Sequence, residues 1–337
     1  MILITGATGI LGRVIALELL KKGQKVRAAK RPTSNIEEVR ESFRFYTGKP
    51  DFYFEQIEWV DIDFEDLMSL EAVLKDVEEV YHCAAKVSFN PMAQKELYKN
   101  NSEFTERLLF AIDPAKVKKF LFVSSVAVLD GFNDQGEMDE NSDFNAKLDH
   151  SDYAISKYIS EMAVWRASAE GLNTIIINPG LIIGSGNWQH SSGTLFRQMS
   201  NAFTFPGSTA YVDVRDVAKI AVELMERNIF GQRFIVTSEN VKYKHIADKV
   251  RRHFGKKPAK LVPNFILDVL PIVSTIFGWI IPIFKLASKA NIETVRSDSK
   301  ITNKKIRETL NYQFIPIDES VDFHLKNYAE SIAKSKS

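Results

Sequence analysis

Short apolar runs alternate with longer stretches of helical spacing along the first two thirds of the chain. The short runs are apolar at successive positions, which is typical of strands buried between two layers of helices. This alternation predicts an α/β fold with a doubly wound parallel sheet and right-handed crossovers. Strands are expected at 1–5, 25–29, 57–60, 79–85 and 119–123, and helices at 14–23, 67–74, 91–112 and around 153–157, with an irregular, partly helical insertion at 33–56.

A glycine-rich turn, TGATGILG, follows the first strand directly. In a turn of this kind one glycine permits the tight bend, one lets backbone amides approach a pyrophosphate, and one lets the next helix pack closely on the strand. The strand–turn–helix context favours a dinucleotide site over the alternative that the glycines only turn the chain. The residues expected to bind the cofactor here are Gly6, Thr8, Gly9, Ile10, Leu11 and Gly12.

Two cations, Lys30 and Arg31, stand at the end of the second strand, where a dinucleotide fold faces the adenosine ribose. An acid there would accept a hydrogen bond from the 2′-hydroxyl, whereas an arginine would pair with a 2′-phosphate. The pattern therefore favours NADP(H), with NAD(H) as the alternative if the cations only belong to a solvated loop. After the third strand, Asp61 is expected to accept from the adenine amino group and Ile62 to pack on the ring.

The fourth strand ends in small residues, Ala84 and Ala85, which leave room for a cofactor beside Lys86. His82 within this strand is interpreted as a packed core histidine. In the following helix, Asn101 is the polar exception in an apolar stripe.

Tyr153 and Lys157 are four residues apart, so on a helix their side chains are adjacent. A neighbouring ammonium favours the phenolate and is expected to lower the pKa of the tyrosine from about 10, which suits proton exchange with a hydroxyl or carbonyl. Ser125 follows a parallel strand at the sheet edge where ligands bind, and could hold the same oxygen. We therefore take Ser125, Tyr153 and Lys157 as the candidate catalytic residues, with Asn101 in support.

The amino-acid composition bears on which partners, metals and compartments the protein could have. The chain has 337 residues, 45% of them hydrophobic, and a formal net charge of +1, which calls for no nucleic-acid partner. One cysteine and six histidines without paired spacing favour neither a disulfide nor a metal site. A cytoplasmic protein without a signal peptide is expected.

The C-terminal part is less regular. Trp188 and His190 lie in a loop at 184–193 and are candidates for substrate contact, although local packing explains them equally well. A basic stretch at 242–260 precedes an apolar one at 264–286, which could span a membrane, lie on a membrane surface, or form a helical wall over an apolar substrate pocket. The apolar residues assigned to such a pocket or interface are Phe265, Leu267, Leu270, Ile276, Phe277 and Trp279.

Taken together, these motifs resemble the extended short-chain dehydrogenase/reductase superfamily, which includes the NAD-dependent epimerase/dehydratase family. The resemblance covers residues 1 to about 225, and the stretch VRAAKR at 26–31 is most similar to the dihydroflavonol reductase-like branch, with the 3β-hydroxysteroid dehydrogenase-like enzymes close by. It implies a Rossmann-type domain at 1–180, with 209–237 returning to it, and a smaller substrate lobe at 181–337.

The resemblance also implies roles and partners. Tyr153 would be the general acid/base, Lys157 would bind the nicotinamide ribose, and Ser125 would bind the substrate oxygen. Pro179, Gly180 and Ile182 would hold the nicotinamide end. A homodimer through the helices at 91–112 and 152–169 is implied as well. Two departures from the superfamily pattern are Phe104 in place of glycine and Val126-Ala127 after the serine, the second of which argues against dehydration chemistry.

The resulting prediction is an NADP(H)-dependent oxidoreductase that interconverts a ketone or aldehyde and an alcohol, acting on a partly apolar substrate. One rival is a nucleotide-sugar epimerase with tightly held NAD, for which Arg197, Arg215 and Arg233 could clamp the diphosphate. Another is a regulator that senses the dinucleotide without chemistry, and the presence of Tyr153 and Lys157 counts against it.

Overall fold

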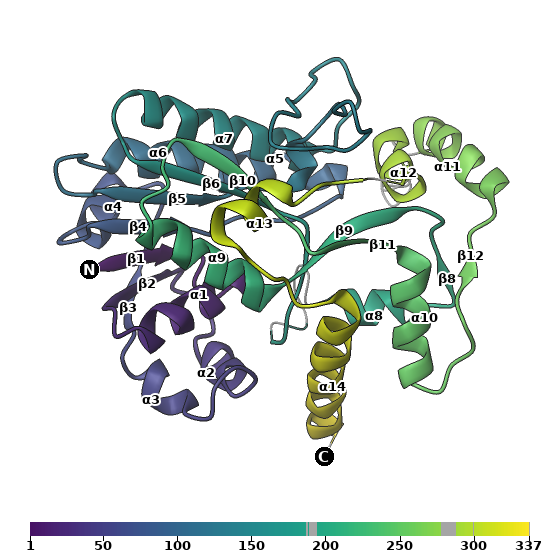
Figure 1. Ribbon diagram of the computed structural model, residues 1–337, viewed down its shortest axis with the longest axis horizontal. Helices are drawn as coiled ribbons and strands as arrows, with labels where there is room; N and C mark the ends of the chain where they lie inside the picture. The colour runs from purple at the N-terminus through teal and green to yellow at the C-terminus, as the bar shows by residue number, and fades with distance from the viewer. Residues whose placement is uncertain (187, 189–193, 278–287, 299, 337) are drawn as a thin grey trace.

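A sheet of seven parallel strands forms the centre of the molecule in the computed structural model, which describes residues 1–186, 188, 194–277, 288–298 and 300–336 (Figure 1). The strand order is β10-β6-β5-β4-β1-β2-β3, so the order reverses between β1 and β4, which is where such sheets bind ligands. The strands are β1 (Ile2–Thr5), β2 (Val26–Lys30), β3 (Glu58–Asp61), β4 (Glu79–His82), β5 (Lys119–Val123), β6 (Thr174–Pro179) and β10 (Gln232–Val236). The predicted Rossmann-type fold is confirmed.

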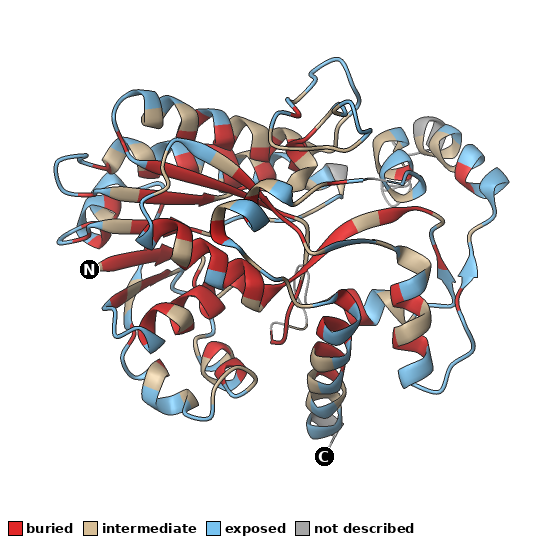
Figure 2. Cartoon of the chain, viewed as in Figure 1, coloured by how far each residue is buried: buried red, intermediate tan, exposed pale blue. Residues whose placement is uncertain are grey.

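Helices cover both faces of this sheet because alternate side chains of each strand point to opposite faces. Ile2 and Ile4 pack in one apolar cluster with α1 and α9, whereas Leu3 packs in another with α4, α6 and α7. Figure 2 shows the buried strands and the buried inner faces of these helices. The helices of this part are α1 (Ile10–Lys21), α2 (Glu37–Phe43), α3 (Pro50–Phe54), α4 (Leu67–Val73), α5 (Gln94–Leu97), α6 (Phe104–Ala111), α7 (Asp152–Ala169) and α9 (Val214–Glu226).

A second lobe lies to one side of the large sheet and contains two smaller sheets, with strand orders β11-β9-β7 and β12-β8 (Figure 1). The chain leaves the large sheet after β6, forms part of this lobe, and returns through α9 and β10. Its elements are β7 (Leu181–Ile183), α8 (Leu195–Met199), β8 (Phe203–Thr204), β9 (Ser208–Asp213), β11 (Glu239–Lys242), α10 (Tyr243–His253), β12 (Lys260–Leu261), α11 (Asn264–Phe277), α12 (Lys289–Arg296), α13 (Lys304–Leu310) and α14 (Ile317–Lys336).

Two elements differ from the pattern-based expectation. The expected long helix at 91–112 begins with a 3₁₀ turn, Pro91–Ala93, and is interrupted between α5 and α6 by a π-helical turn, Tyr98–Glu103. Turns of this kind are rare and often occur at functional sites. In addition, β4 ends at His82, so the small residues after it form a loop beside the glycine turn. A short 3₁₀ turn, Val126–Val128, follows β5.

Candidate active site

The glycine turn between β1 and α1 has a shape that side chains would prevent. Gly6 has φ +70°, and a Cβ atom there would lie 2.6 Å from the Ala84 backbone nitrogen. A Cβ atom on Gly12 would lie 2.3 Å from the Gly6 carbonyl oxygen. Gly9 caps α1 and donates its N–H to the same carbonyl at 2.9 Å. The first and third glycines thus allow the tight bend and the close helix packing, and the turn at the helix N-terminus suits a dinucleotide pyrophosphate.

Arg13 supports the glycine turn, and the sequence reasoning missed it. It is fully buried, and its Nε donates to the Gly9 carbonyl at 3.1 Å while its guanidinium also donates to the Thr8 carbonyl. Glu38 of α2 lies 3.5 Å from the guanidinium. Burial lowers the pKa of Arg13, and Glu38 opposes this effect. The sequence does contain a signal, because Arg13 is a cation that immediately follows the third glycine and precedes the apolar run Val14-Ile15-Ala16-Leu17. Arg13 therefore fixes the carbonyls on the inner side of the turn.

The predicted adenosine end contains one ion pair and one exposed cation. Lys30 Nζ lies 2.5 Å from the Asp61 carboxylate, so these two expected cofactor residues pair with each other. Arg31 is exposed, and in the described part of the chain its side chain has no partner. Ile62 is buried in the cluster that contains Leu3. Arg31 is therefore the cation left available to a 2′-phosphate.

Asn101 lies in the π-helical turn and holds the loop after β4. Its side chain accepts from the Lys86 N–H at 2.7 Å and donates to the Lys86 carbonyl at 3.0 Å. It also donates to Ser156 Oγ of α7 at 2.9 Å, and Ser102 donates to the Ser156 carbonyl at 3.0 Å. The Lys86 side chain pairs with Glu96. Asn101 is thus a positioning residue that ties the cofactor side of the loop, with Ala84 and Ala85, to the helix of Tyr153.

The three candidate catalytic residues come from β5 and α7. Ser125 follows β5 and caps the turn after it, while Tyr153 and Lys157 are buried on one face of α7. The Tyr153 ring packs edge-on against Phe89, with the ring centres 5.8 Å apart. The Lys157 ammonium lies over the Phe122 ring, 4.1 Å from its centre, and donates to the Val123 carbonyl at 2.6 Å.

The expected lowering of the Tyr153 pKa by Lys157 is wrong for this structure. Burial raises the pKa of Tyr153, and hydrogen bonding with the Ser125 side chain opposes the rise. Burial also lowers the pKa of Lys157 to about 7, against the effect of Glu161. The physical reason is that desolvation disfavours both charged forms and that the Lys157 ammonium donates to a backbone carbonyl.

Glu161, one turn after Lys157, forms a buried polar support beneath the Ser125 loop. It accepts from Ser124 Oγ at 2.6 Å and from the Asn178 amide at 3.1 Å, and the same amide donates to the Ser125 carbonyl at 3.1 Å. The guanidinium of Arg233, on β10, lies 3.2 Å from Glu161. Arg233 was one of the three arginines considered for a diphosphate clamp, and here its charge is paired inside the protein.

The nicotinamide end was assigned to Pro179, Gly180 and Ile182. Pro179 ends β6, and Ile182 lies in the neighbouring short strand β7. Between them, a Cβ atom on Gly180 would lie 2.4 Å from the Ala210 carbonyl oxygen, so only glycine fits where the chain passes β9. The contacts of these residues with a cofactor stay a prediction.

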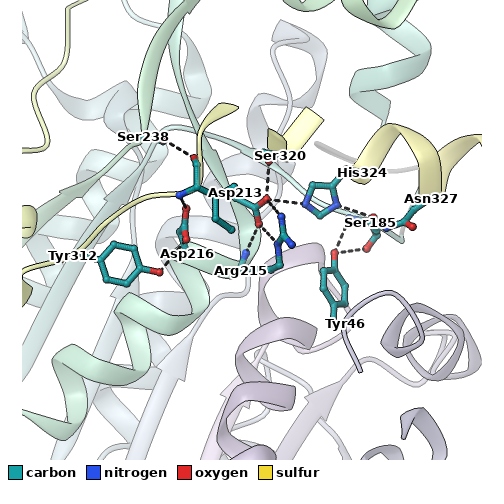
Figure 3. Close-up of polar contacts among 11 residues, drawn as sticks. Tyr46, Ser185, Asp213, Arg215, Asp216, Ser238, Tyr312, Ser320, His324 and Asn327 are labelled. Carbon is teal, nitrogen blue, oxygen red and sulfur yellow. Dashed lines mark hydrogen bonds and ion pairs between the residues drawn. The ribbon is translucent and has the colours of Figure 1, made fainter. Parts of the chain in front are cut away.

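Figure 3 shows a second buried network, centred on Asp213 at the start of α9. Asp213 accepts from Arg215 at 2.7 Å, from Ser320 at 2.7 Å and from His324 at 3.1 Å. Burial favours a higher Asp213 pKa, but the hydrogen bonds from Arg215 and His324 hold the pKa well below its usual range. Arg215, the second arginine considered for the clamp, is thus paired internally, whereas Arg197 is exposed on α8.

The same network reaches the loop after β7. His324 Nδ1 lies 2.7 Å from Ser185 Oγ, which also accepts from Asn327 at 2.8 Å. The Tyr46 hydroxyl accepts from the Ser185 N–H at 2.7 Å and donates to its carbonyl at 3.0 Å. A Cβ atom on the next residue, Gly186, would lie 2.9 Å from the Arg13 guanidinium. Helix α14 and the insertion at 33–56 therefore hold this loop close to Arg13, which binds the glycine turn.

Trp188 packs locally, against Phe45 of the insertion at 6.0 Å and Tyr328 of α14 at 5.2 Å between ring centres. His190 lies outside the described residues. A cavity of about 340 Å³ opens beside Tyr153, next to Asp152 and Phe89, but Ser125, Tyr153 and Lys157 do not line it. Its lining residues are Ser88, Phe89, Asn90, Asp149, His150, Ser151, Asp152, Ser288, Lys289, Ala290 and Asn291. Asn291 of α12 donates to the Phe89 carbonyl at 3.0 Å, so the second lobe supplies one wall.

The apolar stretch at 264–286 is only partly described. Leu267 is buried, Leu270 is half-buried and Phe265 is exposed, whereas the side chains of Ile276 and Phe277, and Trp279 altogether, lie outside the described residues. Phe104, the departure from glycine, stacks on Phe64 at 4.7 Å within the subunit. Within the described ranges, no helix is long and apolar enough to cross a membrane, and no cluster of His, Cys, Asp and Glu could hold a metal.

His82 is a packed core histidine, as its apolar surroundings suggested. Thr105 donates to the Asn101 carbonyl at 2.6 Å, so it accepts from His82 Nε2 at 3.0 Å, and Thr5 then donates to Nδ1 at 2.6 Å. Burial, followed by the charge of Lys157, lowers the pKa of His82 to about 3. The neutral ring is the form that this network accommodates.

Stability should therefore fall in acid because of His82. The unfolded chain binds the extra proton below about pH 6.5, whereas the folded protein takes it up only near pH 3, so the free energy of unfolding should drop by about 1.4 kcal/mol per pH unit between these values. Urea unfolding at several pH values would measure this slope. In His82→Gln, the dependence of the free energy of unfolding on pH should be weaker by about 1.4 kcal/mol per pH unit. An equal pH dependence in the two proteins would contradict the conclusion that His82 is buried in its neutral form.

A comparison with known families decides the identity of the chain. The model of the NAD dependent epimerase/dehydratase family matches residues 2–236. The chain belongs to this family. It is accordingly an NAD(P)-dependent enzyme of the extended short-chain dehydrogenase/reductase superfamily, as the motifs predicted.

Individual members of the family are similar over most of the chain. Sterol demethylase protein B of Methylococcus capsulatus is 31% identical over 243 residues, which cover 71% of this chain and 70% of that protein. Cinnamoyl-CoA reductase 1 of Arabidopsis thaliana is 25% identical, covering 97% of this chain and 88% of the reductase. The crystal structure of gox2253 covers 98% of both chains with a TM-score of 0.81 and 24% identity, which supports the fold.

Proposed function

We propose that this epimerase/dehydratase-family protein is an NADP(H)-dependent oxidoreductase that interconverts a ketone or aldehyde and the matching alcohol, with a partly apolar substrate. The observation that carries the proposal is the hydrogen bond between the Tyr153 and Ser125 side chains, with Lys157 one helical turn further on, at the sheet edge that also holds the glycine turn. The names of the two relatives, a sterol demethylase protein and a cinnamoyl-CoA reductase, are consistent with a bulky apolar substrate.

The residues present fit a dinucleotide, because side chains at Gly6 and Gly12 would destroy the turn that faces the pyrophosphate. When bound, the reduced nicotinamide supplies the hydride for the carbonyl carbon. Tyr153 and Ser125 then orient the carbonyl oxygen by hydrogen bonds, and Tyr153 donates the proton that completes the alcohol. The buried, protonated Tyr153 is suited to this step, because burial keeps its pKa high and its hydroxyl available as a donor.

Lys157 has the second role in this scheme. Its pKa of about 7 means that the ammonium is close to losing a proton at neutral pH. A hydrogen-bonded ribose hydroxyl next to Tyr153 would stabilise the protonated ammonium, so Lys157 would bind and orient the ribose. Asn101 supports both groups, because it joins the loop at Lys86 to Ser156, which lies between them on α7.

The nucleotide-sugar epimerase is the weaker alternative. Two of the three arginines that could clamp a sugar diphosphate are paired with buried carboxylates, Arg215 with Asp213 and Arg233 with Glu161. Releasing either arginine would leave its carboxylate buried and unpaired, which is costly.

Arg31 provides the test of cofactor choice. In Arg31→Asp, we expect the NADPH dissociation constant to rise roughly 10- to 100-fold because a charge-assisted contact with the 2′-phosphate is replaced by repulsion, while NADH affinity stays nearly unchanged. Calorimetric titration of both cofactors would measure this. Lys116→Asp, which makes the same charge change at a distant exposed ion pair, is the matched control. Equal NADPH affinity in Arg31→Asp and the native protein would contradict the NADP(H) proposal.

A further inference from the structure

Helix α11 has two faces of different character. Leu267 is fully buried, and Asp268 pairs with Arg296 of α12 at 2.7 Å. On the other face, Phe265, Val269 and Ile272 are 68%, 49% and 59% exposed. Their spacing of four and three residues places them on one side of the helix. The helix is thus fastened to the protein by one face and presents an apolar face to solvent.

The segment before α11 extends this apolar surface. Leu261 lies four residues before Phe265 and is exposed in β12, which pairs with β8 beside the exposed Phe203. In Figure 1 these elements lie along the outer side of the second lobe, and Figure 2 shows them largely exposed. Exposed apolar side chains gathered in this way are uncommon on a soluble surface and indicate a binding face.

Unpaired positive charge flanks the same segment. Lys256, Lys257 and Lys260 are exposed and lie within nine residues of Phe265. Across the described ranges, none of the three lysines has a carboxylate partner. The nearby carboxylate of Asp248 pairs with Lys244 instead. Basic side chains beside an apolar helical face match the chemistry of an anionic lipid surface, where phosphates contact the lysines and the apolar residues enter the headgroup boundary.

We propose that the segment from Lys256 to Ile272 docks the protein on an anionic membrane surface, with Phe265, Val269 and Ile272 inserted and the three lysines on lipid phosphates. A second copy of the chain is a poorer occupant, because a two-fold contact through this face would bring the lysines of both copies together. The proposal does not depend on the reaction that the enzyme catalyses, since none of these residues lines the cavity beside Tyr153.

Vesicle flotation of the full-length protein tests this surface. The protein should float with phosphatidylcholine vesicles that contain phosphatidylserine and remain unbound with pure phosphatidylcholine. The triple variant Lys256→Gln/Lys257→Gln/Lys260→Gln should bind the anionic vesicles roughly 100-fold more weakly. Phe265→Ser/Val269→Ser/Ile272→Ser should also lose binding, whereas Met68→Ser, at an exposed apolar residue of α4, should bind like the native protein.

Several results would overturn the proposal. One is native protein that ignores anionic vesicles, and another is α11 and lysine variants that bind as well as the native chain. A third is native protein that binds no vesicles and elutes as a dimer in size-exclusion chromatography, while the α11 variant elutes as a monomer. The apolar face would then be the contact between two copies of the chain. All substituted side chains are exposed, so thermal melting should show native stability, and the lysine variant tests the surface even if the α11 variant unfolds.

Discussion

Replacement of Tyr153 by phenylalanine is expected to lower kcat about 10²- to 10⁴-fold, because the substitution removes the proton donor for the substrate oxygen. NADPH affinity should change less than about twofold, since the ring that packs against Phe89 is retained and only the hydroxyl is lost. Stopped-flow turnover with an apolar ketone, together with calorimetry of NADPH binding, would separate the two effects.

A hydroxyl on the same helix provides the matched control for that experiment. Tyr158 lies on α7 and stacks on Phe144 at 4.2 Å, so Tyr158→Phe removes a phenolic oxygen without touching the cavity beside Tyr153. Turnover of Tyr158→Phe should equal that of the native enzyme. A different result would contradict this role: Tyr153→Phe could bind NADPH weakly but turn over at the native rate once NADPH is saturating. Tyr153 would then be a cofactor-binding residue, and another group would donate the proton to the substrate oxygen.

Asp213→Ala should lower the free energy of unfolding by about 3–5 kcal/mol, because removal of the buried carboxylate leaves a half-buried cation and two buried polar side chains without their acceptor. Arg215, Ser320 and His324 all donate to this carboxylate, and Asp213 also caps α9. Chemical denaturation followed by tryptophan fluorescence would measure the loss.

The control for this loss is an acid with a similar partner at the surface. Asp298 accepts from Lys242 at 2.6 Å, but both side chains are more than half exposed, so Asp298→Ala should cost less than about 1 kcal/mol. Similar losses of unfolding free energy in the two variants would mean that burial does not strengthen the contribution of the Asp213 network to stability. Under the proposed function, Asp213→Ala should also weaken NADPH binding, since His324 holds the loop of Ser185 and Gly186 close to Arg13, which binds the glycine turn.

The parts of the site that sequence could predict are those fixed by local geometry. The three glycines act within a single turn, and Tyr153 and Lys157 lie one helical turn apart, so their spacing alone placed them together. The parallel, doubly wound sheet followed from the alternation of strands and helices, which permits few topologies.

The parts that could not be predicted depend on partners distant in the sequence. Glu161 of α7 pairs with Arg233 of β10. Asp213 accepts from His324 of α14, which lies more than one hundred residues further along the chain. Asp213 also accepts from the nearby Arg215, but nothing in the local pattern shows that Asp213 will meet His324 or that Glu161 will meet Arg233. The same is true of Lys157, whose contact with the Val123 carbonyl depends on how α7 packs on β5 and which made the expected effect on the Tyr153 pKa wrong.

The π-helical turn at Tyr98–Glu103 has a consequence for how this stretch tolerates change. A π turn holds one residue more than an α-helical turn. The side chains before it are therefore rotated about the helix axis by about 100° relative to the side chains after it. Here that phase lets the adjacent residues Asn101 and Ser102 both reach Ser156. Deletion of a single exposed residue, such as Lys99, would restore an ordinary helix and rotate Asn101 away from Lys86. A one-residue deletion in this turn should therefore be more harmful than any single substitution on its exposed side.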